Sequence, residues 1–186
     1  MGRVSATTRT AITFSGVVEE LGPATIVRLP EKASRELPSR GQVAVEGTLN
    51  GTRFRTVVEP DGRRGHWLNL TTKVRRAAKT SVGDTVDVVL DVAPEWPEPA
   101  VPDDLQAALD TAPADVQETW RDITPMARWE WVRWVNATAN PATRERRVEV
   151  SISKMEHGKR RPCCFDLSSC TDPSVSKSGK LISPSS

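Results

Sequence analysis

Tyrosine is absent from this sequence of 186 residues, which contains only three phenylalanines and two histidines. With so few histidines, acid–base catalysis near neutral pH would need a carboxylate or a lysine whose pKa is strongly shifted. The sequence has no phosphate loop and no Gly-Xaa-Gly-Xaa-Xaa-Gly motif, and no triad-like order of serine, histidine and aspartate stands out. These absences rank an enzyme below a binding protein among the functions that the sequence allows.

Long hydrophobic runs are also lacking, because no apolar stretch approaches the ~20 residues that a membrane-spanning helix needs. The N-terminal segment Met1 to Ser5 lacks the apolar core of an export signal. Cysteine is scarce and occurs only near the C-terminus, at Cys163, Cys164 and Cys170. A secreted disulfide framework spreads an even number of cysteines across the fold. We therefore expect a cytoplasmic protein that does not insert into a membrane.

Neither sign of charge dominates, since the net charge is +2 and the pI is about 8.6. The distribution is uneven, however: residues 1–92 and 141–186 each carry a net +4, whereas residues 93–140 carry −6. A basic excess divided between two blocks is a weak footprint for nucleic acid. The content of 37% hydrophobic and 27% charged residues is typical of a folded globular protein.

Six short runs rich in β-branched residues lie between Ala11 and Val92 and are typical of strands. They are residues 13–19, 26–29, 42–49, 52–58, 66–70 and 84–92. The third and fourth runs are joined by Asn50-Gly51, a strong hairpin signal because both residues tolerate a positive φ. Six such strands with few long helices predict a small β-barrel.

An internal repeat divides this block into two similar halves. Residues 29–37 and 70–78 each begin with leucine at a strand end, continue as a helical turn with exposed Lys and Arg, and lead through a glycine to another strand. The two copies lie 41 residues apart in their helical parts. Two copies of one strand–helix–strand unit predict a pseudo-twofold barrel in which neither half buries its apolar face alone.

Proline recurs throughout the rest of the chain. The segment from Ala93 to Pro102 is rich in proline, which stiffens a linker and forbids regular structure. We therefore predict an α+β protein with a barrel domain at 10–93, a linker at 94–102, a small helical domain at 103–160 and an extended tail at 161–186 that contains the cysteines.

Helix starts are predicted from proline at the first helical position, where its missing N–H removes no hydrogen bond. The four candidates are Pro102, Pro113, Pro125 and Pro141. Thr124 and Asn140 are predicted N-caps. The positions of Trp129, Val132 and Val135 predict one helical face, with Trp120 packing against it. Residues 148–152 also alternate like a strand, which leaves their helical assignment open.

The second domain resembles the YdeI or OmpD-associated family, also described as bacteriocin-protection proteins. The stretches that carry the resemblance are residues 102–105, 108–109, 123–125, 131–135 and 141–147, with the similarity ending near residues 156–159. The first domain resembles the barrel domain of unknown function that often precedes that family, on Asn50-Gly51-Thr52 and residues 66–70. The resemblance implies a link to envelope stress or bacteriocin tolerance, and it implies no particular chemistry.

The first candidate site is the barrel surface around His66, Lys73, Arg75 and Arg76. An opening with several cations and the aromatic Trp67 suits an anionic small molecule. The alternative is that Trp67 belongs to the core and that the lone histidine beside it is structural.

The second candidate site is formed by Arg144 and Arg147, which share a helical face near the positive end of the helix dipole. They suit a phosphate or an acidic partner. The alternative is that they pair with the acidic residues of 103–122, as exposed charges usually do.

A weaker candidate is a metal site of His157 with Cys163, Cys164 and Cys170, since three thiolates and an imidazole suit Zn²⁺. Adjacent cysteines rarely chelate one ion, so we favour free thiols, no metal and no cofactor. The basic residues 159–161 would lower a nearby thiol pKa, which leaves a redox-sensitive pair as a third reading.

The sequence thus favours a non-catalytic binding or regulatory protein whose partner is a protein or a small anionic ligand. The alternative is a nucleic-acid-binding regulator, because the repeat also resembles the swapped-hairpin barrels of AbrB-type regulators. That reading predicts dimers and an affinity that falls steeply with salt. An enzyme ranks third.

Overall fold

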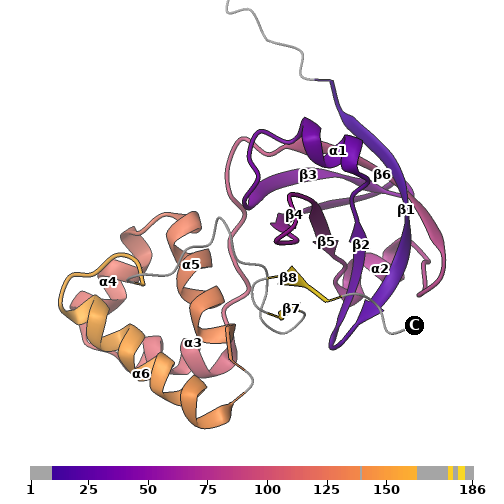
Figure 1. The fold of residues 1–186 in the computed structure, drawn as a ribbon. Helices are drawn as coiled ribbons and strands as arrows, with labels where there is room; N and C mark the ends of the chain where they lie inside the picture. The colour runs from indigo at the N-terminus through magenta and orange to yellow at the C-terminus, as the bar shows by residue number, and fades with distance from the viewer. Residues whose placement is uncertain (1–9, 139, 163–175, 178–179, 183–186) are drawn as a thin grey trace, which may run out of the picture.

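The computed structural model describes residues 10–138, 140–162, 176–177 and 180–182. Figure 1 shows a β-barrel and a group of helices joined by an extended segment. The barrel is closed, with six antiparallel strands in the order β1-β2-β5-β4-β3-β6. The strands are β1 (Ile12–Leu21), β2 (Ala24–Arg28), β3 (Val43–Leu49), β4 (Thr52–Pro60), β5 (His66–Asn69) and β6 (Thr85–Val92). This architecture confirms the predicted fold class.

The strand pairing has the predicted pseudo-twofold symmetry. Exchanging β1 with β4, β2 with β5 and β3 with β6 leaves every neighbour relation in the barrel unchanged. Helix α1 (Glu31–Glu36) follows β2, and helix α2 (Thr72–Ala77) follows β5 at the equivalent place. Two hydrogen bonds repeat the symmetry: Leu29 N donates to His66 O at 3.0 Å, and Leu70 N donates to Thr25 O at 2.8 Å. The two halves therefore interlock.

Glycine sets the geometry at two points of the barrel. The β3–β4 hairpin turns at Asn50 and Gly51, whose φ values of 48° and 82° confirm the predicted turn. Within β3, a Cβ added at Gly47 would lie 1.8 Å from the carbonyl oxygen of Val89 in β6. The close approach of β3 to β6 therefore depends on a residue without a side chain.

Strand alternation gives the barrel an inner core and two apolar areas outside it. Val27 and Leu68 belong to the main core cluster, whereas their neighbours Ile26 and Trp67 belong to a separate cluster with Leu21. These neighbours lie on the outer face of β2 and β5. A third cluster joins Ala44 of β3 and Val57 of β4 to residues of the linker and of the helices.

The C-terminal segment returns to the barrel and covers one of these outer areas. A short hairpin of β7 (Ser176–Lys177) and β8 (Lys180–Leu181) places the side chain of Leu181, which is fully buried, against Trp67. Figure 1 shows β8 beside the barrel strands β2 and β5. The sequence predicted an extended tail and gave no sign of this docking.

Four helices follow the linker, and none of the helices in the described ranges is long and apolar enough to cross a membrane. They are α3 (Asp103–Asp110), α4 (Ala114–Asp122), α5 (Pro125–Asn136) and α6 (Pro141–Glu156). Pro125 and Pro141 are first helical residues, as predicted. For Pro102 and Pro113 the prediction is wrong by one position, because these two residues are N-caps. Thr124 and Asn140 cap their helices as predicted, accepting from backbone N–H groups at 3.2 Å and 3.1 Å.

The helical core differs from the prediction at one tryptophan. Trp131, Val132 and Val135 of α5 are buried in it, and Trp120 packs at its edge. Trp129 does not share that face: it contacts Trp96 edge-on, with ring centroids 6.4 Å apart, on the side toward the barrel. A residue two positions before Trp131 is turned about 200° around a helix, which accounts for the error.

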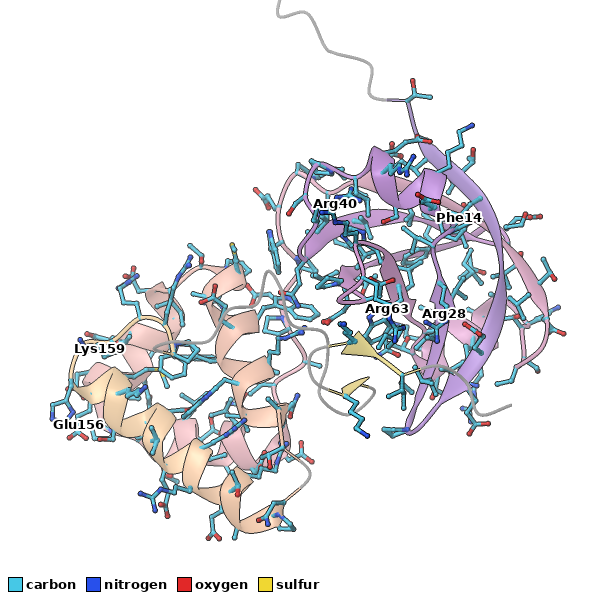
Figure 2. All side chains as sticks on the ribbon, viewed as in Figure 1. Phe14, Arg28, Arg40, Arg63, Glu156 and Lys159 are labelled. Carbon is cyan, nitrogen blue, oxygen red and sulfur yellow. The ribbon has the colours of Figure 1, made fainter. Side chains whose placement is uncertain are left out.

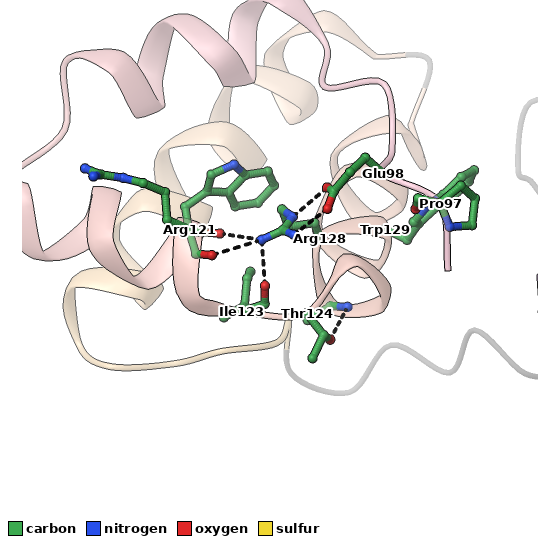
Figure 3. A network of polar contacts seen from close by, with 9 residues as sticks. Pro97, Glu98, Arg121, Ile123, Thr124, Arg128 and Trp129 are labelled. Carbon is green, nitrogen blue, oxygen red and sulfur yellow. Dashed lines mark hydrogen bonds and ion pairs between the residues drawn. The ribbon is translucent and has the colours of Figure 1, made fainter. Parts of the chain in front are cut away.

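Polar contacts fix the linker to helix α5 (Figure 3). Arg128 forms an ion pair with Glu98 at 2.6 Å and donates to the carbonyl of Ile123 at 2.6 Å, near the C-terminal end of α4. The indole of Trp129 donates to the carbonyl of Pro97 at 2.6 Å. Arg133 of α5 forms an ion pair with Glu59 of β4, and both side chains are mostly buried. The barrel and the helices therefore share a polar and aromatic interface.

Candidate functional site

His66 is a buried structural residue, with 1% of its surface exposed. Its Nε2 lies 2.8 Å from the carbonyl oxygen of Gly41, and its Nδ1 lies 2.7 Å from Oγ of Ser34. Because a carbonyl only accepts, Nε2 carries the proton, and Nδ1 accepts the serine hydroxyl. His66 therefore ties β5 to α1 and to the loop before β3.

The environment of His66 keeps its imidazole neutral. Burial lowers the pKa of His66 below 6.5, and the positive charge of Arg40 lowers it further. The hydrogen bond to Gly41 and the carboxylate of Asp61 act in the opposite direction without reversing the shift. Both ring nitrogens are occupied, so this Ser34–His66 pair has no free nitrogen with which to accept a proton from a substrate.

Beside this pair lies a cleft of about 680 Å³. We call it the arginine cleft, because four of the side chains that line it are Arg35, Arg40, Arg63 and Arg64. The remaining lining residues are Leu29, Glu31, Leu37, Asp61 and Gly65. Helix α1, the loop after it and the turn between β4 and β5 thus bring together residues that are distant in the sequence.

Arg40 is held in place by backbone carbonyls. Its guanidinium donates to the carbonyl of Leu37 at 3.1 Å and to that of Ser34, both at the C-terminal end of α1. It also donates to the carbonyl of Arg64 at 3.3 Å. Carbonyls hold the side chain without neutralising its charge.

The turn between β4 and β5 presents the other two arginines. The carboxylate of Asp61 accepts from the backbone N–H groups of Arg63 at 2.7 Å and of Gly65 at 2.8 Å, which closes the turn. Arg64 adopts a φ of 74° in it. The guanidinium of Arg63 donates to the carbonyl of Leu181 at 3.1 Å. Figure 2 shows Arg63 and Arg28 beside β8 and Arg40 nearer α1.

The arginine cleft has an excess of positive charge. Arg35 forms an ion pair with Glu31, while Arg40, Arg63 and Arg64 form no ion pair with any residue in the described ranges. The carboxylate of Asp61 is engaged by backbone N–H groups. An anion entering the cleft would therefore meet three guanidinium groups that have no acidic partner in the described parts of the chain.

Lys73, Arg75 and Arg76 lie on α2 and not with His66, so the structure does not bring the first predicted cluster into one cavity. Lys73 lines a separate cavity of about 300 Å³ together with Arg53 and Arg55 of β4. Arg75 is half-buried, and its Nε has no hydrogen-bond partner among the described residues. Arg76 is exposed.

The second predicted pair is engaged within the helical region. Arg144 forms two hydrogen bonds with Asp104, at 2.6 Å and 3.0 Å, and they lower the pKa of that carboxyl and raise that of Arg144. Arg147 donates to the carbonyl of Trp134 at 2.8 Å and lies over its ring, 5.5 Å from the centroid. The Arg144–Asp104 pair is of the kind that the alternative reading predicted, whereas Arg147 contacts a carbonyl and a ring and no acidic residue of 103–122.

The metal candidate falls largely outside the described residues, because Cys163, Cys164 and Cys170 lie there. His157 is exposed, and its Nδ1 lies 2.7 Å from the carbonyl oxygen of Ser153. Within the described residues, no group of three or more His, Cys, Asp or Glu side chains is placed to hold a metal ion.

Sequence reasoning missed all four arginines of the cleft. The only available signal was Asp61-Gly62-Arg63-Arg64-Gly65, a turn sequence with two adjacent cations between strands. Its proximity to Arg35 and Arg40 depends on β2 pairing with β5, which the sequence pattern does not specify.

The structure thus defines a protein built from a closed pseudo-twofold β-barrel and a helical region, with a cationic cleft at the barrel. Residues 14–90 match the model of DUF1905, a domain of unknown function, and residues 98–158 match that of the family described as Bacteriocin-protection, YdeI or OmpD-Associated. The chain therefore carries a DUF1905 domain followed by a bacteriocin-protection, YdeI or OmpD-associated domain, which confirms the predicted resemblance. No curated protein matches the chain.

Proposed function

We propose that this protein is a non-catalytic binding module whose barrel takes a small anionic ligand in the arginine cleft. The observation that carries the proposal is the presence of three arginines without an acidic partner in the described residues, gathered around a cleft of about 680 Å³. Cavities of this size are typical of small-molecule sites.

The chemistry of the arginines favours a carboxylate or phosphate ligand. Guanidinium groups present planar pairs of N–H donors that match the oxygens of such anions. Arg40 is already ordered by its bonds to carbonyls, so less side-chain entropy is lost when it binds. Leu29 and Leu37 add an apolar wall that suits an anion with an organic body.

The state of the neighbouring Ser34–His66 pair supports binding without turnover. Ser34 is 1% exposed and its hydroxyl is bonded to the imidazole, while the other nitrogen of His66 donates to Gly41. A nucleophile needs access to its substrate and a base with a free nitrogen. The pair is better suited to supporting the wall of the cleft.

The family of the helical domain supports a link with bacteriocin tolerance as the biological setting of this binding. In that setting, ligand binding at the barrel would be conveyed to a protein partner of the helices. The ion pair between Arg133 and Glu59 joins the two parts of the molecule and supports such coupling.

The test is a calorimetric titration of the whole protein with inorganic pyrophosphate and with citrate. We expect saturable binding that Arg64→Gln weakens about tenfold, since a charged hydrogen bond contributes about 1.5–3 kcal/mol. Arg76→Gln is the matched control, because Arg76 is exposed on α2 and lies outside the cleft. Absence of binding, or equal weakening by both variants, would contradict the proposal.

The nucleic-acid alternative is separated by a second titration with duplex DNA. If the barrel binds DNA, the logarithm of the DNA-binding constant should fall linearly with the logarithm of the salt concentration. Tight DNA binding that Arg64→Gln leaves unchanged, together with no uptake of pyrophosphate or citrate, would favour that alternative.

A further inference from the structure

The outer face of β2 and β5 carries a cluster of large apolar side chains. Ile26 and Trp67 point away from the main core, and Leu21 of β1 lies beside them. Their exposed fractions are 0%, 1% and 4%, so they are as buried as interior residues. Large apolar side chains on an outer face need a cover, since exposed patches of this kind mark interaction sites.

The cover is the chain's own C-terminal segment. Leu181 is fully buried against these three residues, which together form what we call the leucine socket. Burying a leucine side chain removes apolar surface from water and therefore favours the docked tail.

Three backbone groups of the tail are bound as well. Leu181 N donates to the carbonyl of Asp61 at 2.9 Å. Arg63 donates to the carbonyl of Leu181 at 3.1 Å, and Arg28 donates to the carbonyl of Ile182 at 3.0 Å. The surface therefore offers one acceptor and two donors to consecutive residues of an extended segment, with a socket for the side chain between them.

We propose that the leucine socket, with Arg28, Arg63 and the Asp61 carbonyl, is a peptide-docking site, and that residues 180–182 are its resident occupant. Main-chain bonds give such a site affinity for any extended peptide, and the socket selects the residue. The partner it fits is an extended segment with a leucine-sized aliphatic residue at the central position. This goes beyond the proposed function, because the ligand is a peptide and the apolar socket lies outside the arginine cleft.

The attachment of the tail explains why the site is filled. An occupant on the same chain acts at a high effective concentration, so a segment with modest intrinsic affinity stays bound. A partner peptide must displace the tail. The apparent affinity of that peptide is the intrinsic affinity multiplied by the fraction of molecules in which the socket is open. Removal of the tail should therefore reveal binding that the intact chain conceals.

The experiment measures binding of a fluorescent peptide with the sequence of residues 176–183 by anisotropy. Two proteins with an emptied socket are compared with the intact chain: one ending at residue 175, and a full-length Leu181→Asp variant, in which every other tail residue is kept. We expect both to bind the peptide at least tenfold more tightly than the intact chain. The second protein keeps the test valid where truncation lowers solubility.

Matched controls define the site. A peptide in which the leucine is replaced by aspartate should not bind, and Arg28→Gln in the truncated chain should weaken binding severalfold, whereas Arg76→Gln should not. Equal binding to the intact and truncated chains, or equal binding of the two peptides, would overturn the proposal. So would failure of both emptied proteins to bind. The arginine cleft shares Arg63 and Asp61 with this site, so it is tested by pyrophosphate titration of the intact chain, in which the tail stays in place.

Discussion

At the scale of single residues, His66 links the stability of the barrel to pH. Its imidazole is buried, neutral and bonded at both nitrogens, to Ser34 and Gly41. Since the pKa of His66 is lowered in the folded protein, the unfolded chain takes up a proton at a higher pH than the folded one. The free energy of unfolding therefore falls as the pH drops below about 6.5, the ordinary value for histidine.

Replacing His66 tests this linkage. We expect His66→Gln to lower the free energy of unfolding at pH 7.5, because it removes the imidazole that joins α1 to β5. It should also flatten the decline in stability between pH 7 and pH 5. Urea denaturation at several pH values measures both effects. His157→Gln is the matched control, since His157 is exposed and should leave the profile unchanged; a wild-type profile in His66→Gln would refute the assignment.

The residue scale also shows what the sequence could not reveal. The sequence allowed a structural role for the lone histidine next to Trp67. It could not identify the partners, because Ser34 and Gly41 are 32 and 25 residues away in the sequence. The predicted grouping of His66 with Lys73 assumed that residues near in sequence face one opening. Lys73 lies on the six-residue helix α2 and lines another cavity, and the arginines that do gather near the buried His66 come from other segments.

At the scale of elements, the strands and the repeat were predictable because their signals are local. Alternation gave all six strands, and Asn50-Gly51 gave the hairpin. Helix starts were less certain: proline fits both the N-cap and the first helical position, as Pro113 and Pro125 show. The short strands β7 and β8 carry no periodicity, so their docking was not predictable from pattern alone.

Within β3, Gly47 fixes the contact with β6. We expect Gly47→Ala to destabilise the protein by about 3 kcal/mol, at the upper end for overpacking, because the new Cβ would meet a backbone oxygen. Gly16→Ala is the matched comparison, since its Cβ would meet a side-chain methyl of Val27 at 2.6 Å and the loss should be smaller. Thermal or urea unfolding of the two variants measures the difference. Equal stability of Gly47→Ala and the unaltered protein would contradict this account of the strand contact.

At the scale of the whole molecule, the ion pair between Arg133 and Glu59 connects the helices to the barrel. Breaking a mostly buried pair leaves one charge without its partner, so Arg133→Met should destabilise the protein by about 3 kcal/mol. Glu59→Met in the same chain should restore much of that loss. Denaturant unfolding of the two single variants and the double variant forms the required cycle. Additive losses would show that the two side chains do not depend on each other.

The two interlocked halves of the barrel are two copies of one structural unit on a single chain. Residues 12–49 and 52–92 have the same order of elements, and Asn50-Gly51 is the joint between them. Because both halves lie on one chain, their sequences can differ. The first half has Thr25 and Ser34 where the second has His66 and Arg75, so only one end of the barrel holds a serine–histidine contact. A symmetric homodimer of such units would present every site twice. In this chain the arginine cleft occurs beside α1, and the region beside the equivalent helix α2 has a different set of side chains.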